Sequence, residues 1–135
     1  MALSAEGKPE TILLVEDHLV LLKLVKQILE NAGYTVIQAS SAKQATLLEE
    51  EHPGTIDLLL SDVRMRGMSG ADLAISLKKR RPEMRVALMS GYPGGALLAH
   101  NYGWHYIQKP FVPSSLVSIV ESILREEHKI SLPMT

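Results

Sequence analysis

The segment LLLSDVRMRGMSG, residues 58–70, joins a short apolar run to a polar loop at a single carboxylate, Asp62. A run this short and this apolar is typical of a β-strand that is buried on both faces. The following residues, rich in Met, Arg and Gly, indicate a loop. Asp62 is therefore expected at the carboxyl end of a buried strand, where open α/β sheets place their ligand sites.

Segments of strand and helix character alternate along the rest of the chain. Apolar or β-branched runs predict strands, and apolar residues at helical spacing predict helices. Five repeats of strand and helix predict an α/β fold, a doubly wound five-stranded parallel sheet with helices on both faces. The expected strands are 11–16, 34–40, 56–61, 84–90 and 104–108, and the expected helices lie within 18–33, 41–52, 70–80, 92–103 and 113–128.

Apolar stripes predict which side of the first and last helices faces the sheet. The helix within 92–103 has the least helical sequence, because Gly94 and Gly95 each cost about 1 kcal/mol relative to alanine. The stripe of the first helix is Leu21, Leu24, Val25, Ile28 and Leu29, and that of the last helix is Leu116, Ile119, Val120, Ile123 and Leu124.

Composition excludes several classes of function. The chain has 135 residues, of which 46% are hydrophobic and 21% charged, as expected for one globular domain. A formal net charge of -1 provides no basic face for nucleic acid, and the basic run 78–81 is interpreted as a solvated helix end. No apolar run approaches the roughly 20 residues that span a bilayer. The absence of cysteine fits a reducing compartment, and we expect a cytoplasmic protein without membrane insertion.

Polar residues stand where the predicted strands end. Glu16 and Asp17 close the first strand, Asp62 the third, Ser90 the fourth and Lys109 the fifth. Because parallel strands share one carboxyl edge, all five residues are expected to face it. Crowded carboxylates take up a proton or bind a hard cation such as Mg²⁺ or Mn²⁺. With an ammonium and a hydroxyl added, the group suits phosphoryl transfer to Asp62, which would give an acyl phosphate.

Taken alone, Glu16 and Asp17 have a second interpretation. Asp is a favourable residue at the position that caps a helix, so the acidic pair could simply cap the helix that follows. The presence of Asp62 and Lys109 at the same expected edge favours the metal site.

Four motifs in order resemble the response-regulator receiver domains of two-component systems. They are LLVED (13–17), LLLSDVRMRGMSG (58–70), ALMSGY (87–92) and YIQKPF (106–111). The resemblance implies a flavodoxin-like (βα)5 three-layer sandwich with strand order 2-1-3-4-5. It also implies a receiver domain over residues 11–128, with an N-terminal tail at 1–10 and a C-terminal tail at 129–135.

The resemblance implies a phosphoacceptor switch. Asp62 would accept a phosphoryl group from a histidine kinase, and Lys109 and Ser90 would bind the phosphoryl oxygens. Mg²⁺, or Mn²⁺, would be held by the side chains of Glu16, Asp17 and Asp62 and by the backbone carbonyl of Arg64.

Two further features follow from the resemblance alone. Ser90 and Tyr106 match the switch pair that turns toward the site when phosphate arrives. The Lys109–Pro110 peptide bond matches a cis peptide of the family.

The loop after Asp62 departs from the family pattern Met-Pro-x-Met-x-Gly, because Arg66 replaces the proline. Arg64 and Tyr92 occupy two positions that, by resemblance, tune the rate of dephosphorylation. A bulky pair there predicts a long-lived phosphoaspartate. The alternative is that Arg64 and Arg66 are solvated side chains on an exposed loop.

The resemblance also implies partners. A histidine kinase or a histidine phosphotransfer domain would dock on the helix within 18–33 and on the loop after strand 104–108. An output partner or a second copy would use the surface formed by residues 92–103, strand 104–108 and the last helix. A stand-alone regulator and the receiver of a hybrid kinase both remain open.

Three alternatives compete with a switch that is not an enzyme acting on a small molecule. A Mg²⁺-dependent phosphohydrolase of the haloacid-dehalogenase kind needs a second carboxylate two residues after the nucleophile, where this chain has Arg64. A flavodoxin-like cofactor binder needs a Ser-, Thr- and Gly-rich loop in place of EDHLVL (16–21). A degenerate receiver that signals without phosphate is disfavoured, because every acceptor-site residue type is present.

Overall fold

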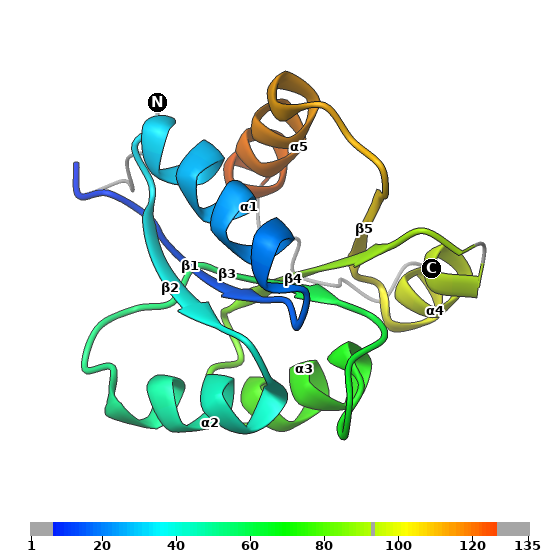
Figure 1. Cartoon of the computed structure of the whole chain (residues 1–135). Coiled ribbons are helices and arrows are strands. Elements are labelled where there is room, and N and C mark those ends of the chain that lie inside the picture. Colours follow the sequence, from blue (N-terminus) through cyan, green and yellow to red (C-terminus); the bar gives the residue numbers. More distant parts are fainter. Residues whose placement is uncertain (1–6, 93, 127–135) are drawn as a thin grey trace, which may run out of the picture.

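Strands and helices alternate throughout the computed structural model, which describes residues 7–92 and 94–126 (Figure 1). All strands of the described chain form one parallel sheet of order β2-β1-β3-β4-β5, so the predicted fold class and strand order are confirmed. The elements are β1 Thr11–Val15, α1 Leu19–Asn31, β2 Thr35–Ala39, α2 Ala42–Glu51, β3 Leu58–Asp62, α3 Gly70–Lys78, β4 Arg85–Ser90, α4 Gly94–Tyr102, β5 His105–Gln108 and α5 Pro113–Arg125.

The central strands are buried because helices cover both faces of the sheet. Helices α1 and α5 lie on one face and α2 and α3 on the other, with α4 beside β5 (Figure 1). Leu58, Leu59 and Leu60 of β3 have no exposed surface, which confirms the expected buried strand. The strand ends on Asp62, one residue later than expected, so the carboxylate stands at the carboxyl edge of the sheet.

The predicted buried face of α1 was partly wrong. The residues of α1 that are buried are Leu22, Val25 and Leu29, whereas Leu24 is 51% exposed. The helix is rotated so that positions i, i+3 and i+7 face the sheet, and Leu21 and Ile28 flank them. Ile119 of α5 is likewise exposed, although its neighbours in the predicted stripe, Leu116, Val120, Ile123 and Leu124, are buried.

The expected tails, and the expected domain end at residue 128, lie mostly outside the described residues. Inside the expected N-terminal tail, however, Glu10 is part of the fold, because its carbonyl accepts a hydrogen bond from the Thr35 amide at 2.9 Å. Its carboxylate is buried and pairs with Arg125 at the end of α5. Burial raises the pKa of the Glu10 carboxyl, against the opposing effect of Arg125.

The basic run 78–81 is only partly the solvated helix end that its sequence predicted, because Lys79 and Arg80 are exposed but Arg81 is half-buried. Arg80 and Arg81 both bind the carboxylate of Glu49 on α2, at 2.6 and 2.9 Å. Glu49 is only 4% exposed, and Arg81 also donates to the carbonyls of His52 and Gly54. Burial would raise the pKa of the Glu49 carboxyl, but the hydrogen bonds from the two guanidinium groups outweigh it and hold the pKa below its usual value.

Each of the two longest helices within residues 7–92 and 94–126 has 13 residues. None of the helices in this part of the chain combines the length and apolar character that crossing a bilayer requires.

Replacing Glu49 by Gln is expected to destabilise the protein by about 2 kcal/mol at pH 7, because two guanidinium groups lose the charge of a buried hydrogen-bond acceptor while Arg80 stays partly solvated. A carboxyl whose pKa is lower in the folded state contributes stability above its unfolded pKa of about 4.3 and loses it as the pH falls through the folded pKa. Urea unfolding should therefore show a difference between native and Glu49→Gln proteins that shrinks below about pH 4. The exposed Glu51→Gln change is the control, and an equal loss in both variants would contradict the assignment.

Candidate functional site

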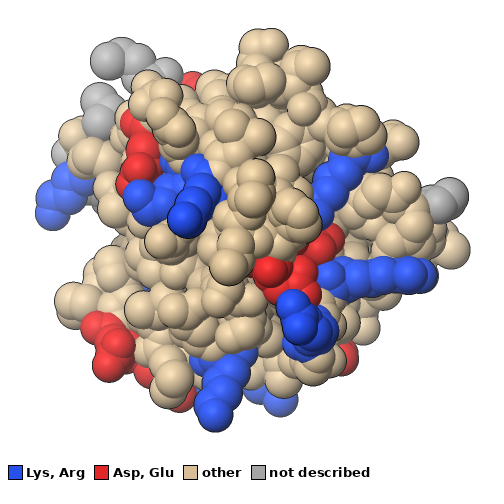
Figure 2. Space-filling view, in the orientation of Figure 1, with Lys and Arg blue, Asp and Glu red and all other residues tan. Residues whose placement is uncertain are grey.

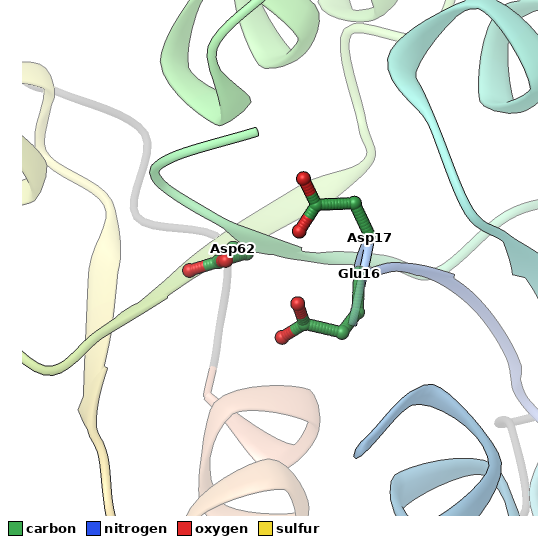
Figure 3. Close-up of side chains that lie close together, drawn as sticks. All are labelled: Glu16, Asp17 and Asp62. Atoms are coloured by element: carbon green, nitrogen blue, oxygen red, sulfur yellow. The ribbon is translucent and has the colours of Figure 1, made fainter. Parts of the chain in front are cut away.

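Three carboxylates meet where two neighbouring strands end (Figure 3). Glu16 and Asp17 follow β1 and Asp62 ends β3, and these strands are paired with Val15 opposite Ser61. One ligand oxygen from each of the three side chains lies within 4.8 Å of the others. The parallel pairing of β1 and β3 thus places Asp17 beside Asp62, which lies 45 positions later in the sequence, and the common edge is the one that the strand-end pattern predicted.

Backbone amides hold two of these carboxylates in place. Glu16 is 1% exposed and accepts a hydrogen bond from the His18 amide at 3.1 Å. Asp17 accepts one from the Arg66 amide at 3.2 Å, which ties the loop after β3 to the end of β1. The site therefore does not need a proline at position 66 to bring the loop to the acidic pair.

Lys109 provides a positive charge within the cluster. Its Nζ lies 2.6 Å from Glu16 Oε1 and 3.3 Å from Asp62 Oδ1. The Lys109–Pro110 peptide bond that follows is cis. Figure 2 shows an acidic patch on this face with Lys and Arg side chains around it, so charges of both signs converge at the same edge.

Asp62 is held in an environment that disfavours its charge. Burial and the neighbouring carboxylate of Glu16 raise the pKa of Asp62, and Lys109 only partly opposes them. Such a set of oxygen donors with excess negative charge suits a hard divalent cation like Mg²⁺. The residues present fit the metal that the sequence predicted, with Glu16, Asp17 and Asp62 as its side-chain ligands.

The acidic pair does not cap α1, so the alternative interpretation of Glu16 and Asp17 was wrong. The capping residue is His18, whose Nδ1 accepts a hydrogen bond from the Leu21 amide at 3.2 Å. Both carboxylates are therefore available to the cluster at the sheet edge.

Ser90 and Tyr106 lie on the neighbouring strands β4 and β5, and a hydrogen bond joins them. Ser90, at the end of β4, is 2% exposed, and its Oγ accepts a hydrogen bond from the Tyr92 amide at 3.0 Å. The Tyr106 hydroxyl donates to the Ser90 carbonyl at 2.9 Å. In this state the serine hydroxyl is engaged with its own loop, and the tyrosine ties β5 to that loop.

Arg64 is exposed but is not simply solvated. Its guanidinium carbon lies 4.1 Å from the centre of the Tyr92 ring, which is a cation–π contact. The two positions that sequence resemblance linked to dephosphorylation are thus joined as one stacked pair. The Arg66 side chain is exposed, and its backbone amide makes the contact to Asp17.

Gly70 also shapes the site, and sequence reasoning assigned it no role. A Cβ at this position would lie 2.1 Å from the backbone oxygen of Asp62 and 2.9 Å from Ser61 Oγ. Only glycine allows the start of α3 to approach the end of β3 this closely. In the sequence, the only indication of such a role is that Gly70 ends the MSG segment, at the start of the predicted helix.

Comparison with known proteins agrees with this geometry. The response regulator receiver domain family matches residues 12–121. The chain is 32% identical over 120 residues to the sensor kinase CckA of Brucella abortus, which covers 87% of the chain and 13% of the kinase. It is 35% identical over 119 residues to the transcriptional regulatory protein CpxR of Escherichia coli K12, covering 87% of the chain and 50% of the regulator.

A solved structure shows the same likeness. A CheY-like receiver domain protein from Methanospirillum hungatei has 31% identity and a TM-score of 0.77, covering 85% of this chain and 93% of its own. The chain belongs to the response regulator receiver domain family of two-component systems. Receiver domains are phosphoacceptor signalling domains that bind Mg²⁺ at an acidic pocket and interact with histidine kinases and output domains.

Magnesium is expected to stabilise the protein against unfolding, by about 2.7 kcal/mol when free Mg²⁺ is at a hundred times its dissociation constant. Asp62→Asn and Asp17→Asn should lose most of this gain, because each removes one charged ligand. Without metal, Asp62→Asn should be at least as stable as the native protein, since burial and Glu16 disfavour the charge it removes.

Thermal unfolding with and without Mg²⁺ measures both effects. The exposed Asp72→Asn change on α3 is the control and should keep the full stabilisation. An equal Mg²⁺ response in all four proteins would contradict the assignment of the metal ligands.

Proposed function

We propose that this chain is a phosphoacceptor switch in which Asp62 accepts a phosphoryl group from a histidine kinase. The observation that carries the proposal is the convergence of Glu16, Asp17 and Asp62 with Lys109 at one sheet edge. A transferring phosphoryl group requires neutralisation of charge and in-line positioning, and little covalent chemistry from the protein. This cluster offers a carboxylate nucleophile beside an ammonium.

The reaction exchanges one bond to phosphorus for another. An Asp62 carboxylate oxygen forms a bond to phosphorus while the bond between phosphorus and the donor imidazole nitrogen breaks. The imidazole nitrogen keeps the electron pair of the broken bond, and the donor leaves as neutral imidazole because its other ring nitrogen carries a proton. When the bond to phosphorus forms, the negative charge of the Asp62 carboxylate passes to the phosphoryl oxygens. Lys109 then leaves its ion pair with Glu16 and Asp62 and binds one of these oxygens.

Glu16, Asp17 and Asp62, with the backbone carbonyl of Arg64, are the proposed metal ligands. When bound, Mg²⁺ would neutralise charge on the phosphoryl oxygens. The raised pKa of Asp62 supports this role, because the carboxylate lacks a sufficient counter-charge from Lys109 alone.

Ser90 is proposed to change partners when the phosphoryl group arrives. Its hydroxyl now bonds to the backbone of Tyr92, at 3.0 Å from the amide. Turning toward Asp62 would break this contact and release the loop between β4 and α4. Because Tyr106 donates to the carbonyl of the same serine, movement of the loop would be transmitted to β5.

Two alternatives have less support. A phosphohydrolase of the haloacid-dehalogenase kind would need a carboxylate where Arg64 carries its stacked guanidinium. A receiver that acts without phosphate would have no use for an ion pair between Lys109 and the buried Glu16 beside a carboxylate, Asp62, with a raised pKa. We therefore propose that the chain assists its own phosphorylation and dephosphorylation and does not turn over a small molecule.

The proposed docking face for the kinase or phosphotransfer domain lies between α1 and the loop after β5. A groove of about 480 Å³ there is lined by apolar side chains that include Leu24 and Phe111, and Lys109 stands at its edge. Val20 on α1, 73% exposed, extends the apolar surface. A partner docked in this groove would lie next to the acceptor site. The proposed output or self-association face is the surface of α4, β5 and α5, where Leu97 is 63% exposed.

Acetyl phosphate is expected to phosphorylate the native protein in the presence of Mg²⁺, because the site itself supplies the acceptor and its electrostatic environment. A phosphate-affinity gel should show a retarded band that disappears without Mg²⁺ and in Asp62→Asn. If no band appears, beryllofluoride binding distinguishes an inert site from one that loses phosphate quickly. Failure of both assays on the native protein would overturn the proposal.

The stacked Arg64–Tyr92 pair is expected to lengthen the lifetime of the phosphoaspartate by limiting the approach of water. An exposed cation–π contact worth about 0.5–1 kcal/mol corresponds to a change of about 2–5-fold in rate. Arg64→Ala, Tyr92→Ala and the double variant should all shorten the half-life to a similar extent, since each breaks the same contact. Arg64→Lys, which keeps the charge but not the planar group, tests whether stacking matters. A native half-life no longer than that of the double variant would refute this role.

A further inference from the structure

The first two residues of α4 face aromatic rings beside the acceptor site. A Cβ on Gly94 would lie 2.7 Å from Cε2 of Tyr92. A Cβ on Gly95 would lie 2.7 Å from the Cβ of Ser90 and 3.0 Å from Cε1 of Tyr106. The two contacts of 2.7 Å would force Tyr92 or Ser90 to move, and the 3.0 Å contact would press on the Tyr106 ring, so at both positions the neighbouring groups occupy space that only a glycine leaves free.

The two rings each hold a residue of the proposed site. The Tyr92 ring carries the guanidinium of Arg64 at 4.1 Å, and the Tyr106 hydroxyl bonds to the carbonyl of Ser90 at 2.9 Å. Gly95 is buried against Ser90, whereas Gly94 is exposed at the start of the helix. Each glycine therefore sets the place of a ring, and each ring sets the place of a functional side chain.

Local helix propensity does not explain this pair. Glycine is the least favourable helix residue after proline, and two in succession weaken the first turn of α4. A sequence that departs from its local preference at a close contact indicates that the contact itself is required.

We propose that Gly94 and Gly95 are positioning residues for the phosphorylation response, Gly94 through the Tyr92–Arg64 stack and Gly95 through Tyr106 and Ser90. The inference rests on the proposed function, because the effect of each ring is exerted on the Asp62 site. It extends that function to two residues that make no contact with the phosphoryl group.

The test compares Gly94→Ala and Gly95→Ala with a matched control, Ala96→Gly. The control changes helix propensity at an exposed position of the same helix without entering the space of either ring. The chain has four tyrosines, so the aromatic NMR spectrum of the unphosphorylated protein reports each ring separately, with Tyr34 as a distant reference. Beryllofluoride affinity with Mg²⁺ and the phosphoaspartate half-life then report function.

Gly95→Ala is expected to shift the Tyr106 ring signals and to weaken beryllofluoride binding about tenfold, because overpacking displaces the serine loop. Gly94→Ala is expected to shift the Tyr92 signals and to shorten the half-life about 2–5-fold, as loss of the stack does. Ala96→Gly should lower the melting temperature and leave the Tyr92 and Tyr106 signals and both functional readouts unchanged.

Several outcomes would overturn the inference. Unchanged ring signals in both alanine variants would show that the glycines do not position the rings. Shifted rings with native affinity and native half-life would show a structural role alone. Should Gly95→Ala fail to fold, Gly94→Ala at its exposed position still decides the case through the Tyr92 signals and the half-life. If the native protein itself binds no beryllofluoride and accepts no phosphate, the proposed function is wrong. If the native protein does both and Gly94→Ala and Gly95→Ala behave like it, the role of the glycines alone is wrong.

Discussion

Repulsion among three carboxylates at the end of two adjacent strands is the constraint on which the site depends. The pairing of β1 with β3 brings Glu16 and Asp17 to Asp62, and burial deepens the mutual repulsion because little water remains to screen it. Part of this negative charge is compensated by the ammonium of Lys109 and by hydrogen bonds from the backbone amides of His18 and Arg66. What remains uncompensated is negative charge on Asp62, and this excess is what makes the edge receptive to a divalent cation. Stability and the proposed function are therefore opposed here, since the arrangement that destabilises the metal-free site is the one that phosphoryl transfer to Asp62 would use.

Alternation of buried strands and amphipathic helices sufficed to predict the fold class, and polar residues at strand ends sufficed to predict which side chains would lie along the carboxyl edge, but not which of them would be neighbours. Both inferences depend only on the period of each element and on the shared direction of parallel strands. The strand order came from resemblance, and the structure confirmed it. The rotation of α1 was mispredicted because Leu24 and Leu22 are both leucine, so hydrophobicity alone could not tell the exposed position from the buried one.

Contacts between side chains of different elements could not be predicted in the same way. The burial of Glu49 by Arg80 and Arg81, and the stack of Arg64 on Tyr92, depend on side-chain direction and on loop paths that no periodicity encodes. The resemblance indicated that positions 64 and 92 act on the same rate, but it did not indicate that Arg64 and Tyr92 are in contact. The same holds for Gly94 and Gly95 of α4. Helix propensity predicted that they weaken the helix, but it could not predict the side chains of Tyr92, Ser90 and Tyr106 that lie against them.

The ion pair of Glu10 with Arg125 joins the segment before β1 to the last turn of α5 at the edge of the sheet opposite Asp62. Glu10 and Arg125 therefore lie at one pole, and a strand of five residues, roughly 17 Å, separates that pole from the acidic cluster. The contact that joins the first and last described elements and the acidic cluster therefore occupy opposite poles of one sheet, so the residues that close the fold are not the residues that face a ligand.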